Sequence, residues 1–388
     1  MPRDKRVPFT PAQCVILQKE FGINLIVQPS AWRCFADVEY TALGIKLQDD
    51  VSDCDVLIGI KEVQKSEFIA GKKYLFFSHT IKKQAHNKEL MHALIEKKIQ
   101  MIDYECLTDP NFNRIILFGY FAGIVGAFNA IRAYGKRFSL FELKPAFQCH
   151  DLVELREELR KVRLTNIKMI VTGNGRVANG AIEMMGLLRT RRVTPYEFMN
   201  YSFREAVYTQ LHSNDYNESK TGLQWNREEF YAHPEKFKST FAKFTPHCDM
   251  LIHCSFWDPR APKLFEKSDM KKPDFRLSVI ADVTCDINGS IPSTTKASSI
   301  AEPFYGYNPL TEKTTDYSFD NDVITVMAVD NLPCEIPRDA SESFGKELME
   351  KVIPALLGND PDGLIERASI CLDGKLTKRF EYLNDFAY

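Results

Sequence analysis

The stretch from Lys168 to Leu188 constrains the fold of this chain more than any other segment. An apolar, β-branched run, Lys168-Met-Ile-Val-Thr172, passes directly into the turn Gly173-Asn-Gly175, and helical apolar spacing follows. A strand, a Gly-x-Gly turn and a helix in this order are typical of a dinucleotide-binding unit. A Gly-x-Gly pair alone is usually an ordinary turn, so the flanking strand and helix are what favour a nucleotide site.

Each small residue of this turn has its own physical role. Gly173 makes the tight turn, Gly175 lets the backbone approach a pyrophosphate, and the small Ala178 lets the helix pack on the strand. The amides that open the helix near Arg176 would face the phosphates, because unpaired N–H groups and the helix dipole favour negative charge. We therefore predict that the cofactor, NAD or NADP, contacts Gly173, Gly175, Arg176, Val177 and Ala178.

Composition excludes several other classes of protein. The length of 388 residues, with 44% hydrophobic and 26% charged residues, fits a soluble protein of two domains. A formal charge of −2, without basic residues interleaved with aromatic ones, predicts no nucleic-acid partner. The ten cysteines have no metal-site spacing, which predicts free thiols and no metal. Without an apolar leader or a run of ~18 apolar residues, a cytoplasmic protein with no membrane partner is expected.

The pattern of apolar runs predicts an α/β fold of two Rossmann-like, doubly wound parallel-sheet domains with an active-site cleft between them. The predicted substrate (catalytic) domain comprises residues 1–130 plus 337–388, and the dinucleotide-binding domain comprises residues 131–336. The long apolar segment 115–134 has small residues at helical spacing, which predicts a closely packed, buried connecting helix. Residues 200–248 are expected to form helices and loops. The predicted strands are 23–27, 56–60, 74–78, 99–104, 168–172, 250–255, 277–282 and 323–329, with a helix over 90–98.

Polar side chains follow three of these strands. Lys61 and Glu62 end one strand, His79 ends the next and is followed by Lys82, and Glu105 ends the third and precedes Arg114. The carboxyl ends of parallel strands share one edge of a sheet, so Lys61, His79 and Glu105 should gather there. A histidine titrates near neutral pH and a lysine can be brought towards it, so this set suits proton transfer on an anionic substrate.

Each of these residues also has an ordinary structural explanation. A single histidine at a strand end is more often a hydrogen-bonding group, Lys61 and Glu62 can be a solvated pair, and Lys82 and Lys83 an exposed helix face. Their occurrence together with a nucleotide turn is what favours a catalytic function.

Five motifs in the same order resemble the lysine-forming saccharopine dehydrogenases, within the superfamily of alanine dehydrogenase and transhydrogenase. The resemblance covers nearly the whole chain and extends equally to the lysine–ketoglutarate reductase half of bifunctional lysine-degradation enzymes. The motifs are Phe77-Ser-His-Thr-Ile-Lys-Lys-Gln84, Ile102-Asp-Tyr-Glu105, Arg114 with Phe118-Gly119, Gly173-Asn-Gly-Arg-Val-Ala-Asn-Gly-Ala181 and Ala328-Val-Asp-Asn-Leu-Pro-Cys-Glu-Ile-Pro-Arg-Asp-Ala-Ser341.

The resemblance implies a role for each matching residue. Lys61 would accept the proton of the secondary amine during hydride transfer, and His79 would handle protons during imine hydrolysis. Glu62 and Glu105 resemble carboxylates that tune these two bases. The remaining substrate-binding positions are Arg6, Lys82, Arg114 and Phe118. Cations are physically required there, because a partly buried substrate carboxylate without a partner is costly.

The choice between NAD and NADP stays open. NAD-specific relatives carry an acidic residue at the end of the second strand, and here the corresponding stretch, Arg191-Arg-Val-Thr-Pro-Tyr-Glu197, has Thr194 in that place. Arg189, Arg191 and Arg192 would suit a 2′-phosphate. Asp282 or Asp286 should lie near the nicotinamide, and Asp330 is a further position expected to bind the cofactor.

The sequence thus favours an oxidoreductase that cleaves saccharopine to L-lysine and 2-oxoglutarate. One alternative is reductive formation of saccharopine, or of a related opine-like amine, with NADPH. An alternative of another class is a catalytically silent nucleotide sensor, although a sensor needs neither Lys61 nor His79. Either enzyme would take a small-molecule substrate and act as a monomer or homodimer.

Overall fold

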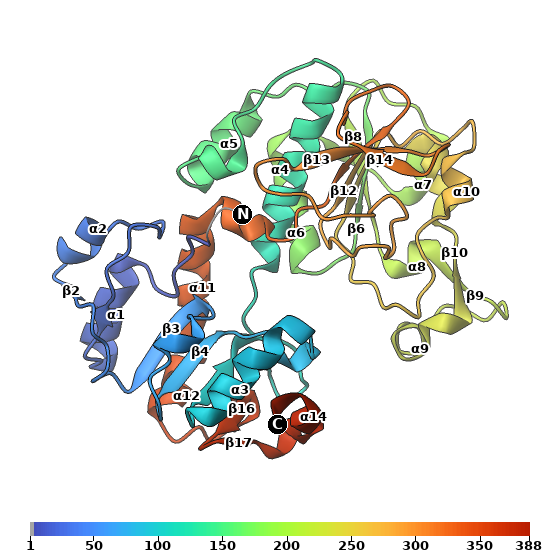
Figure 1. Cartoon of the computed structure of the whole chain (residues 1–388). Coiled ribbons are helices and arrows are strands. Elements are labelled where there is room, and N and C mark those ends of the chain that lie inside the picture. Colours follow the sequence, from blue (N-terminus) through green and yellow to red (C-terminus); the bar gives the residue numbers. More distant parts are fainter. Residues whose placement is uncertain (1–3) are drawn as a thin grey trace. The chain divides into compact units, whose positions relative to one another are not determined.

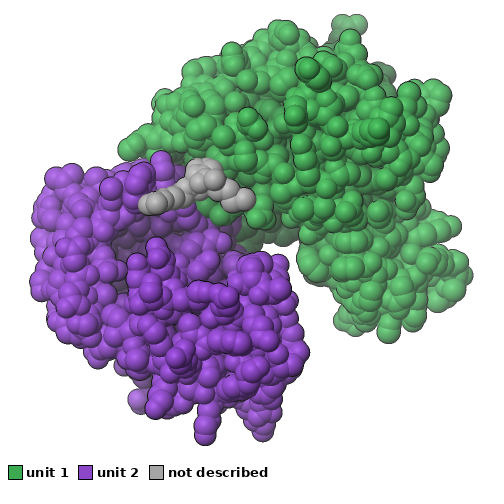
Figure 2. Space-filling model, viewed as in Figure 1, with its two compact units in different colours: residues 1–2, 119–336 green, residues 3–118, 337–388 purple. Residues whose placement is uncertain are grey.

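The structure is a computed structural model that describes residues 4–388, and these divide into two compact units (Figure 2). Unit 1 is the continuous segment Gly119–Ile336, drawn in green. Unit 2, drawn in purple, combines residues 4–118 with Pro337–Tyr388. The boundary between the units falls at Phe118 and Gly119, so residues 119–130, which the sequence analysis grouped with the first domain, lie in unit 1.

Unit 1 contains an eight-stranded sheet in the order β14-β13-β15-β12-β11-β6-β8-β7. The six strands from β15 to β7 are parallel, and β13 and β14 continue the sheet as antiparallel edge strands. The strand bounds are β6 (Lys168–Thr172), β7 (Arg191–Arg192), β8 (Val207–Leu211), β11 (Met250–His253), β12 (Val279–Asp282), β13 (Phe304–Asn308), β14 (Lys313–Thr315) and β15 (Ile324–Met327).

Helices cover both faces of this sheet, as a doubly wound fold requires (Figure 1). Helices α4 (Gly119–Arg137) and α6 (Arg176–Leu187) pack together on one face. The opposite face packs against α7 (Pro195–Asn200), α10 (Lys267–Met270) and the 3-10 segment η7 (Phe241–His247) through a core of aromatic and aliphatic side chains. Both faces are therefore apolar, which explains why β6, β11, β12 and β15 are continuous hydrophobic runs in the sequence.

The contact between α4 and α6 depends on two glycines. A Cβ at Gly123 would lie 1.8 Å from the carbonyl oxygen of Val177, and one at Gly180 would lie 2.0 Å from that of Tyr120. Only residues without a side chain allow the two backbones to approach so closely. The predicted close packing of the segment 115–134 is confirmed, and α4 is the buried helix expected there.

The expectation for residues 200–248 was wrong in one respect, because this region contains a central strand of the sheet. β8 pairs with β6 along its full length. Its sequence, Val207-Tyr-Thr-Gln-Leu211, is a short β-branched and aromatic run, a strand signal that the polar surroundings conceal. The other elements of unit 1 are α5 (Leu152–Arg160), α8 (Ser213–Tyr216), α9 (Arg227–Ala232) and the antiparallel pair β9 (Asn217–Ser219) and β10 (Phe237–Ser239).

Unit 2 contains a five-stranded sheet in the order β17-β16-β5-β4-β3. Strands β3 (Val56–Lys61), β4 (Lys73–Phe77) and β5 (Gln100–Asp103) are parallel, as predicted. The C-terminal part of the chain completes this sheet, because β16 (Ser369–Leu372) pairs antiparallel with β5 and β17 (Lys375–Leu376) with β16. A separate parallel pair consists of β1 (Ile26–Val27) and β2 (Lys46–Leu47).

The helices of unit 2 come from both ends of the chain and share one core. Phe9 and Leu17 from the N-terminal part pack in the same buried cluster as Phe344 and Leu348 from the C-terminal part. The helix bounds are α1 (Pro11–Phe21), α2 (Asp37–Thr41), α3 (Lys88–Glu96), α11 (Pro337–Lys351), α12 (Ile353–Leu357), α13 (Leu364–Ala368) and α14 (Asn384–Ala387).

Across residues 4–388, no helix combines the length and the apolar character that crossing a membrane would demand.

Candidate active site

The carboxyl ends of three parallel strands in unit 2 bring the predicted acid–base residues together. Lys61 is the last residue of β3, His79 follows β4 by two residues, and Glu105 lies in the 3-10 turn η4 (Tyr104–Cys106) directly after β5. The register aligns these strand ends side by side, with Lys61 opposite Phe77 and Phe76 opposite Asp103. The side chains therefore converge at one edge of the sheet.

Hydrogen-bond distances link these side chains into one cluster, the Glu105 cluster, which comprises Lys61, His79, Lys82, Glu105 and Arg114. Nζ of Lys61 lies 3.4 Å from Nε2 of His79, and Nδ1 of His79 lies 3.2 Å from Oε2 of Glu105. The other carboxylate oxygen of Glu105 lies 3.1 Å from Nζ of Lys82 and 3.2 Å from Nη1 of Arg114. The imidazole thus has a basic amine on one ring nitrogen and a carboxylate on the other.

Glu105 is the buried centre of the cluster. Its side chain is only 5% exposed, whereas those of Lys82 and Arg114 are 46% and 43% exposed. Burial alone would raise the pKa of Glu105, but the hydrogen bond from His79 and the charges of Lys82 and Arg114 outweigh it and lower the pKa to about 2. The carboxylate therefore stays ionised and can orient the His79 ring, while Lys82 and Arg114 remain accessible to an anionic ligand.

The aromatic rings of Phe77 and Phe118 pack beside the cluster. The ring of Phe77 stacks on that of His79, with centroids 6.2 Å apart, and also contacts the ring of Phe118. The guanidinium of Arg6 lies 4.1 Å from the Phe118 centroid and forms an ion pair with Asp4 at 2.6 Å. Arg6 and Phe118 thus lie beside the cluster. Glu62 is exposed, and the structure gives it no hydrogen bond or ion pair with a described residue.

In unit 1 the predicted cofactor turn lies at the carboxyl end of β6. Gly173 has a φ of +92°, which favours glycine, and its backbone N–H donates to the carbonyl of Leu211 on β8. Gly175 is the N-cap of α6, and a Cβ built there would meet no atom within 4 Å. Gly175 therefore leaves space at the start of α6, where the N–H groups of a first helical turn favour a pyrophosphate. Ala178 is fully buried.

The strand that neighbours β6 is β8 and not β7. β7 pairs only with β8, so Thr194 lies two strands away from the glycine turn. There Thr194 caps α7 in a reciprocal box with Glu197. The structure instead connects Arg192 to the turn, since its Nη2 donates to Oε1 of Gln210 at 2.7 Å, and Nε2 of Gln210 donates to the carbonyl of Gly173 at 2.7 Å.

The structure distinguishes the two candidate aspartates after β12. Asp282 is fully buried, and its carboxylate accepts hydrogen bonds from the side chains of Thr284 and Thr294 and from the backbone of the following turn. Asp286 is partly exposed, and burial raises its pKa. Asp330 follows β15 and is exposed. Of the three carboxylates, Asp286 and Asp330 are therefore accessible to a ligand, whereas Asp282 is hydrogen-bonded within the loop that follows β12.

Several residues at these edges carried no prediction. Asp103 accepts a hydrogen bond from the backbone of Ser78, next to His79 of the Glu105 cluster. Gln210 and Ser255 lie against the glycine turn. Asp103 and Ser78 do occur inside the quoted motifs, two residues before Glu105 and one residue before His79, so their position was an available signal. Gln210 had none, because its strand was not predicted.

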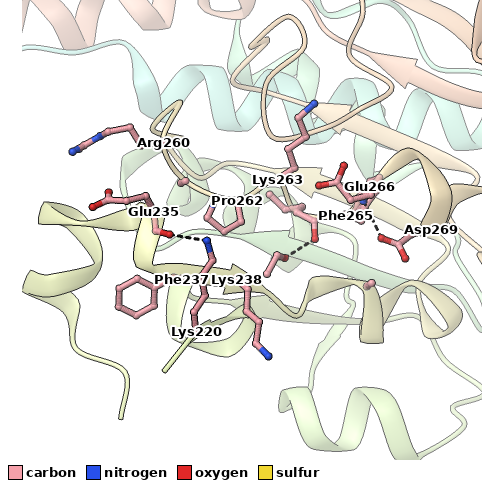
Figure 3. Close-up of a pocket in the computed structure, with 14 residues that line it drawn as sticks. Lys220, Glu235, Phe237, Lys238, Arg260, Pro262, Lys263, Phe265, Glu266 and Asp269 are labelled. Atoms are coloured by element: carbon pink, nitrogen blue, oxygen red, sulfur yellow. Dashed lines mark hydrogen bonds between the residues drawn. The ribbon is translucent and has the colours of Figure 1, made fainter. Parts of the chain in front are cut away.

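Two hollows lie in unit 1. The smaller, about 90 Å³, lies between the ends of β8 and β11 and is lined by Ser213, Tyr216, His253, Ser255, Phe256 and Trp257 among others. Ser255 also touches the glycine turn, so this hollow adjoins the predicted pyrophosphate position. The larger, about 380 Å³, is lined by side chains of both charges, including Lys238, Arg260 and Glu266, and contains no predicted site residue (Figure 3). Lys220 there already donates to the carbonyl of Glu235.

Within residues 4–388, no three His, Cys, Asp or Glu side chains are arranged to hold a metal ion.

Comparisons with known proteins give the chain relatives in sequence and in fold. Residues 1–125 match the family model of the alanine dehydrogenase/PNT N-terminal domain. In fold, the chain is similar to a solved L-alanine dehydrogenase, with a TM-score of 0.66 and 16% identity over 99% of this chain and 97% of that one. The resemblance to this superfamily and the predicted α/β fold class are confirmed.

The chain is also similar to named proteins along nearly its whole length. It is 29% identical to the α-aminoadipic semialdehyde synthase of Arabidopsis thaliana and 27% identical to the mitochondrial enzyme of Rattus norvegicus, over 98% of this chain in both cases. It spans only 40% and 46% of the length of those two proteins. It is 24% identical to the saccharopine dehydrogenase (NAD(+), L-lysine-forming) of Emericella nidulans, over 91% of this chain and 89% of that protein.

Proposed function

We propose that this chain is a pyridine-nucleotide-dependent oxidoreductase that cleaves the secondary amine saccharopine to L-lysine and 2-oxoglutarate. The observation that carries the proposal is the linked set Lys61, His79 and Glu105, with the cations Lys82 and Arg114 at its exposed side. The similarity to saccharopine dehydrogenases over 91% of the chain supports the choice of substrate.

The cluster suits each proton transfer that this reaction needs. A bound nicotinamide would accept the hydride from the substrate carbon. Lys61 would take the proton that leaves the secondary amine, and an imine results. His79 would pass one proton from the attacking water to the imine nitrogen, giving a carbinolamine, and then a second proton from the carbinolamine hydroxyl to the departing lysine nitrogen. The C–N bond then breaks with both protons of the water on the amine. Lys82 and Arg114 would bind substrate carboxylates by charge-assisted hydrogen bonds.

The nucleotide would be held in unit 1. Backbone N–H groups at Gly175, Arg176 and Val177 would bind the pyrophosphate. Asp286 and Asp330 are the carboxylates proposed to face the nicotinamide side.

A second candidate is the reverse reaction, reductive formation of saccharopine with NADPH. Two observations favour it. Arg192 is held next to the glycine turn through Gln210, where a 2′-phosphate would need a cation, and the chain is similar to α-aminoadipic semialdehyde synthases over 98% of its length. A catalytically silent sensor would not need the acid–base residues of the Glu105 cluster.

One assay set tests the proposal. NADH and NADPH oxidation is followed with lysine plus 2-oxoglutarate, and NAD⁺ and NADP⁺ reduction with saccharopine, at several pH values. We expect turnover in both directions and its loss in His79→Gln. The ratio of the two directions and of the two cofactors decides between the candidates. Absence of turnover with every combination would overturn the proposed function.

The cytoplasmic location and the monomeric or homodimeric state remain predictions. Cell fractionation and sedimentation of the purified chain test them, and the mitochondrial designation of the rat relative makes the first worth measuring.

A further inference from the structure

One buried carboxylate connects the loop that carries His79 to the turn that carries Glu105. Asp103, the last residue of β5, has no exposed surface. Its Oδ2 accepts the backbone N–H of Ser78 at 3.0 Å and also the Ser78 hydroxyl, and its Oδ1 accepts the backbone N–H of Glu105 at 2.7 Å. The same side chain therefore fixes the backbone beside both members of the His79–Glu105 pair.

The Ser78 hydroxyl extends this network to the other side of His79. Its oxygen lies 2.8 Å from the hydroxyl of Thr80 and accepts the backbone N–H of Thr80 at 3.3 Å. Ser78 and Thr80 are both fully buried, so His79 is held between two anchored neighbours.

His79 needs such anchoring because its backbone is strained. Its φ of +55° lies in the left-handed region, which side chains other than glycine adopt only at a cost. Residues in this conformation persist when surrounding contacts determine them. Here the contacts that fix the backbone on both sides of His79 are those of Ser78 and Thr80, and Ser78 is hydrogen-bonded to Asp103.

We propose that Asp103 is a positioning residue, which sets the distance between Nδ1 of His79 and Oε2 of Glu105 by holding the two loops that carry them. The effect on turnover rests on the proposed function, whereas the effect on the His79 ring does not. Asp103 is not within reach of a ligand, so it acts only through the residues that it anchors.

The chemistry of the site makes the amide a sensitive replacement. Both oxygens of Asp103 face N–H or O–H donors, so an ionised carboxylate satisfies all three hydrogen bonds. Asp103→Asn keeps the shape but turns an NH₂ towards one of these donors, so at least one bond is lost. Ser78→Ala is the milder companion change, since it removes only the hydroxyl that links Asp103 to Thr80.

The control is Asp360→Asn in the same unit. Asp360 also accepts three backbone N–H groups, from Leu364, Ile365 and Glu366 at the start of α13. It therefore loses comparable hydrogen bonds at a helix cap instead of beside His79.

Two readouts on the full chain test the proposal. The first is NMR of the histidine rings, with His79 assigned by the signals missing in His79→Gln. We expect Asp103→Asn and Ser78→Ala to shift and broaden the His79 signals, and Asp360→Asn to leave them unchanged. The second is kinetics, where we expect kcat to fall about 100-fold in Asp103→Asn and less in Ser78→Ala, with KM values little changed, as small misplacement of a reacting group does.

The outcomes separate the two proposals. If the wild-type chain turns over none of the proposed substrates, the proposed function fails, but the His79 signals still decide the role of Asp103. If Asp103→Asn does not fold, Ser78→Ala decides. Unchanged His79 signals in folded variants, or equal shifts in Asp360→Asn, would overturn the positioning role.

Discussion

The two sheets of this chain present different chemistry at their carboxyl edges. In unit 2 the edge carries charged side chains, with His79 within hydrogen-bond distance of both Lys61 and Glu105. In unit 1 the edge at β6 presents backbone, with glycines at 173 and 175 and the N-terminus of α6. Proton transfer requires titratable side chains, whereas a pyrophosphate is bound by N–H groups at close approach, so each edge has the residues for one part of the proposed reaction.

The comparison extends to what each edge tolerates. Substitution of Lys82 or Arg114 at the unit 2 edge removes a charge but little packing, because both side chains are about half exposed. Near the unit 1 edge, a side chain added at Gly175 would enter open space, whereas one added at Gly180 would collide with the backbone of Tyr120. Substitutions in the two units should therefore fail in different ways.

The largest expected effect is on catalysis at the unit 2 edge. Lys61→Met and His79→Gln should each lower kcat and kcat/KM by ~10²–10⁴-fold with little change in KM, since a positioned proton carrier contributes about that much. Steady-state kinetics across pH measures this. Lys83→Met and His86→Gln are matched controls, because Lys83 pairs with Asp385 and His86 is exposed outside the Glu105 cluster. Wild-type kcat in both test variants would make Lys61 and His79 structural residues.

Two glycines of α6 and its cap should separate binding from stability in unit 1. Gly175→Val places its side chain in open space before the phosphate position, so cofactor affinity should fall while the unfolding midpoint stays near that of the wild type. Gly180→Ala should leave the phosphate position unaltered but destabilise unit 1 by about 3 kcal/mol or more, because its Cβ would collide with the carbonyl of Tyr120.

Titration calorimetry with NADH and NADPH, together with urea unfolding, distinguishes these outcomes. Gly186→Ala is the control within the same helix, since its Cβ would meet no atom, and it should stabilise the chain by about 0.5–1 kcal/mol. If Gly175→Val binds cofactor normally, the nucleotide turn is wrongly assigned.

A smaller effect should separate two adjacent arginines. Arg192 is linked to the glycine turn through Gln210, whereas Arg191 pairs with Glu205 at 2.9 Å and lies over the ring of Phe203. Arg192→Ala should therefore weaken NADPH binding more than NADH binding, by about tenfold if one charge-assisted contact is lost. Arg191→Ala should change both affinities little. Equal losses for the two cofactors in Arg192→Ala would remove the 2′-phosphate assignment.

The smallest effect concerns two buried glutamates with opposite shifts. Against the effect of burial, the hydrogen bond from His79 and the charges of Lys82 and Arg114 lower the pKa of Glu105 to about 2. The stabilising contribution of Glu105 is therefore complete above its ordinary pKa of 4.5 and is lost as pH falls from 4.5 towards 2. Burial of Glu335 in unit 1, which accepts a hydrogen bond from Asn129, raises its pKa to about 8. Its contribution runs the other way, so stability falls as pH rises from 4.5 to about 8.

Urea unfolding at pH 3, 5, 7 and 9 tests both signs. Glu335→Gln should stabilise the chain at pH 9 relative to wild type, with a smaller difference at pH 5. Glu105→Gln should destabilise it at pH 7, with a smaller difference at pH 3. A pH-independent difference for either variant would contradict the corresponding shift.

The sequence by itself determined the strands that are buried on both faces and the polar residues that end them. β3, β4, β5, β6, β11, β12 and β15 lie where apolar runs predicted strands, because a strand covered on both sides must be apolar throughout. The meeting of Lys61, His79 and Glu105 also followed from sequence, since consecutive parallel strands end at one edge.

Only the tertiary structure decided which strand neighbours β6 and which buried groups hold the site. β8 is short and surrounded by polar residues, and strand order depends on long-range pairing that no local pattern records. For the same reason Thr194 and Arg192 could not be ranked, and Asp282 could not be told from Asp286. Asp103 acts through hydrogen bonds to residues 25 positions away and two positions away, and the partners of a buried carboxylate are fixed by the fold, not by its neighbours in the chain.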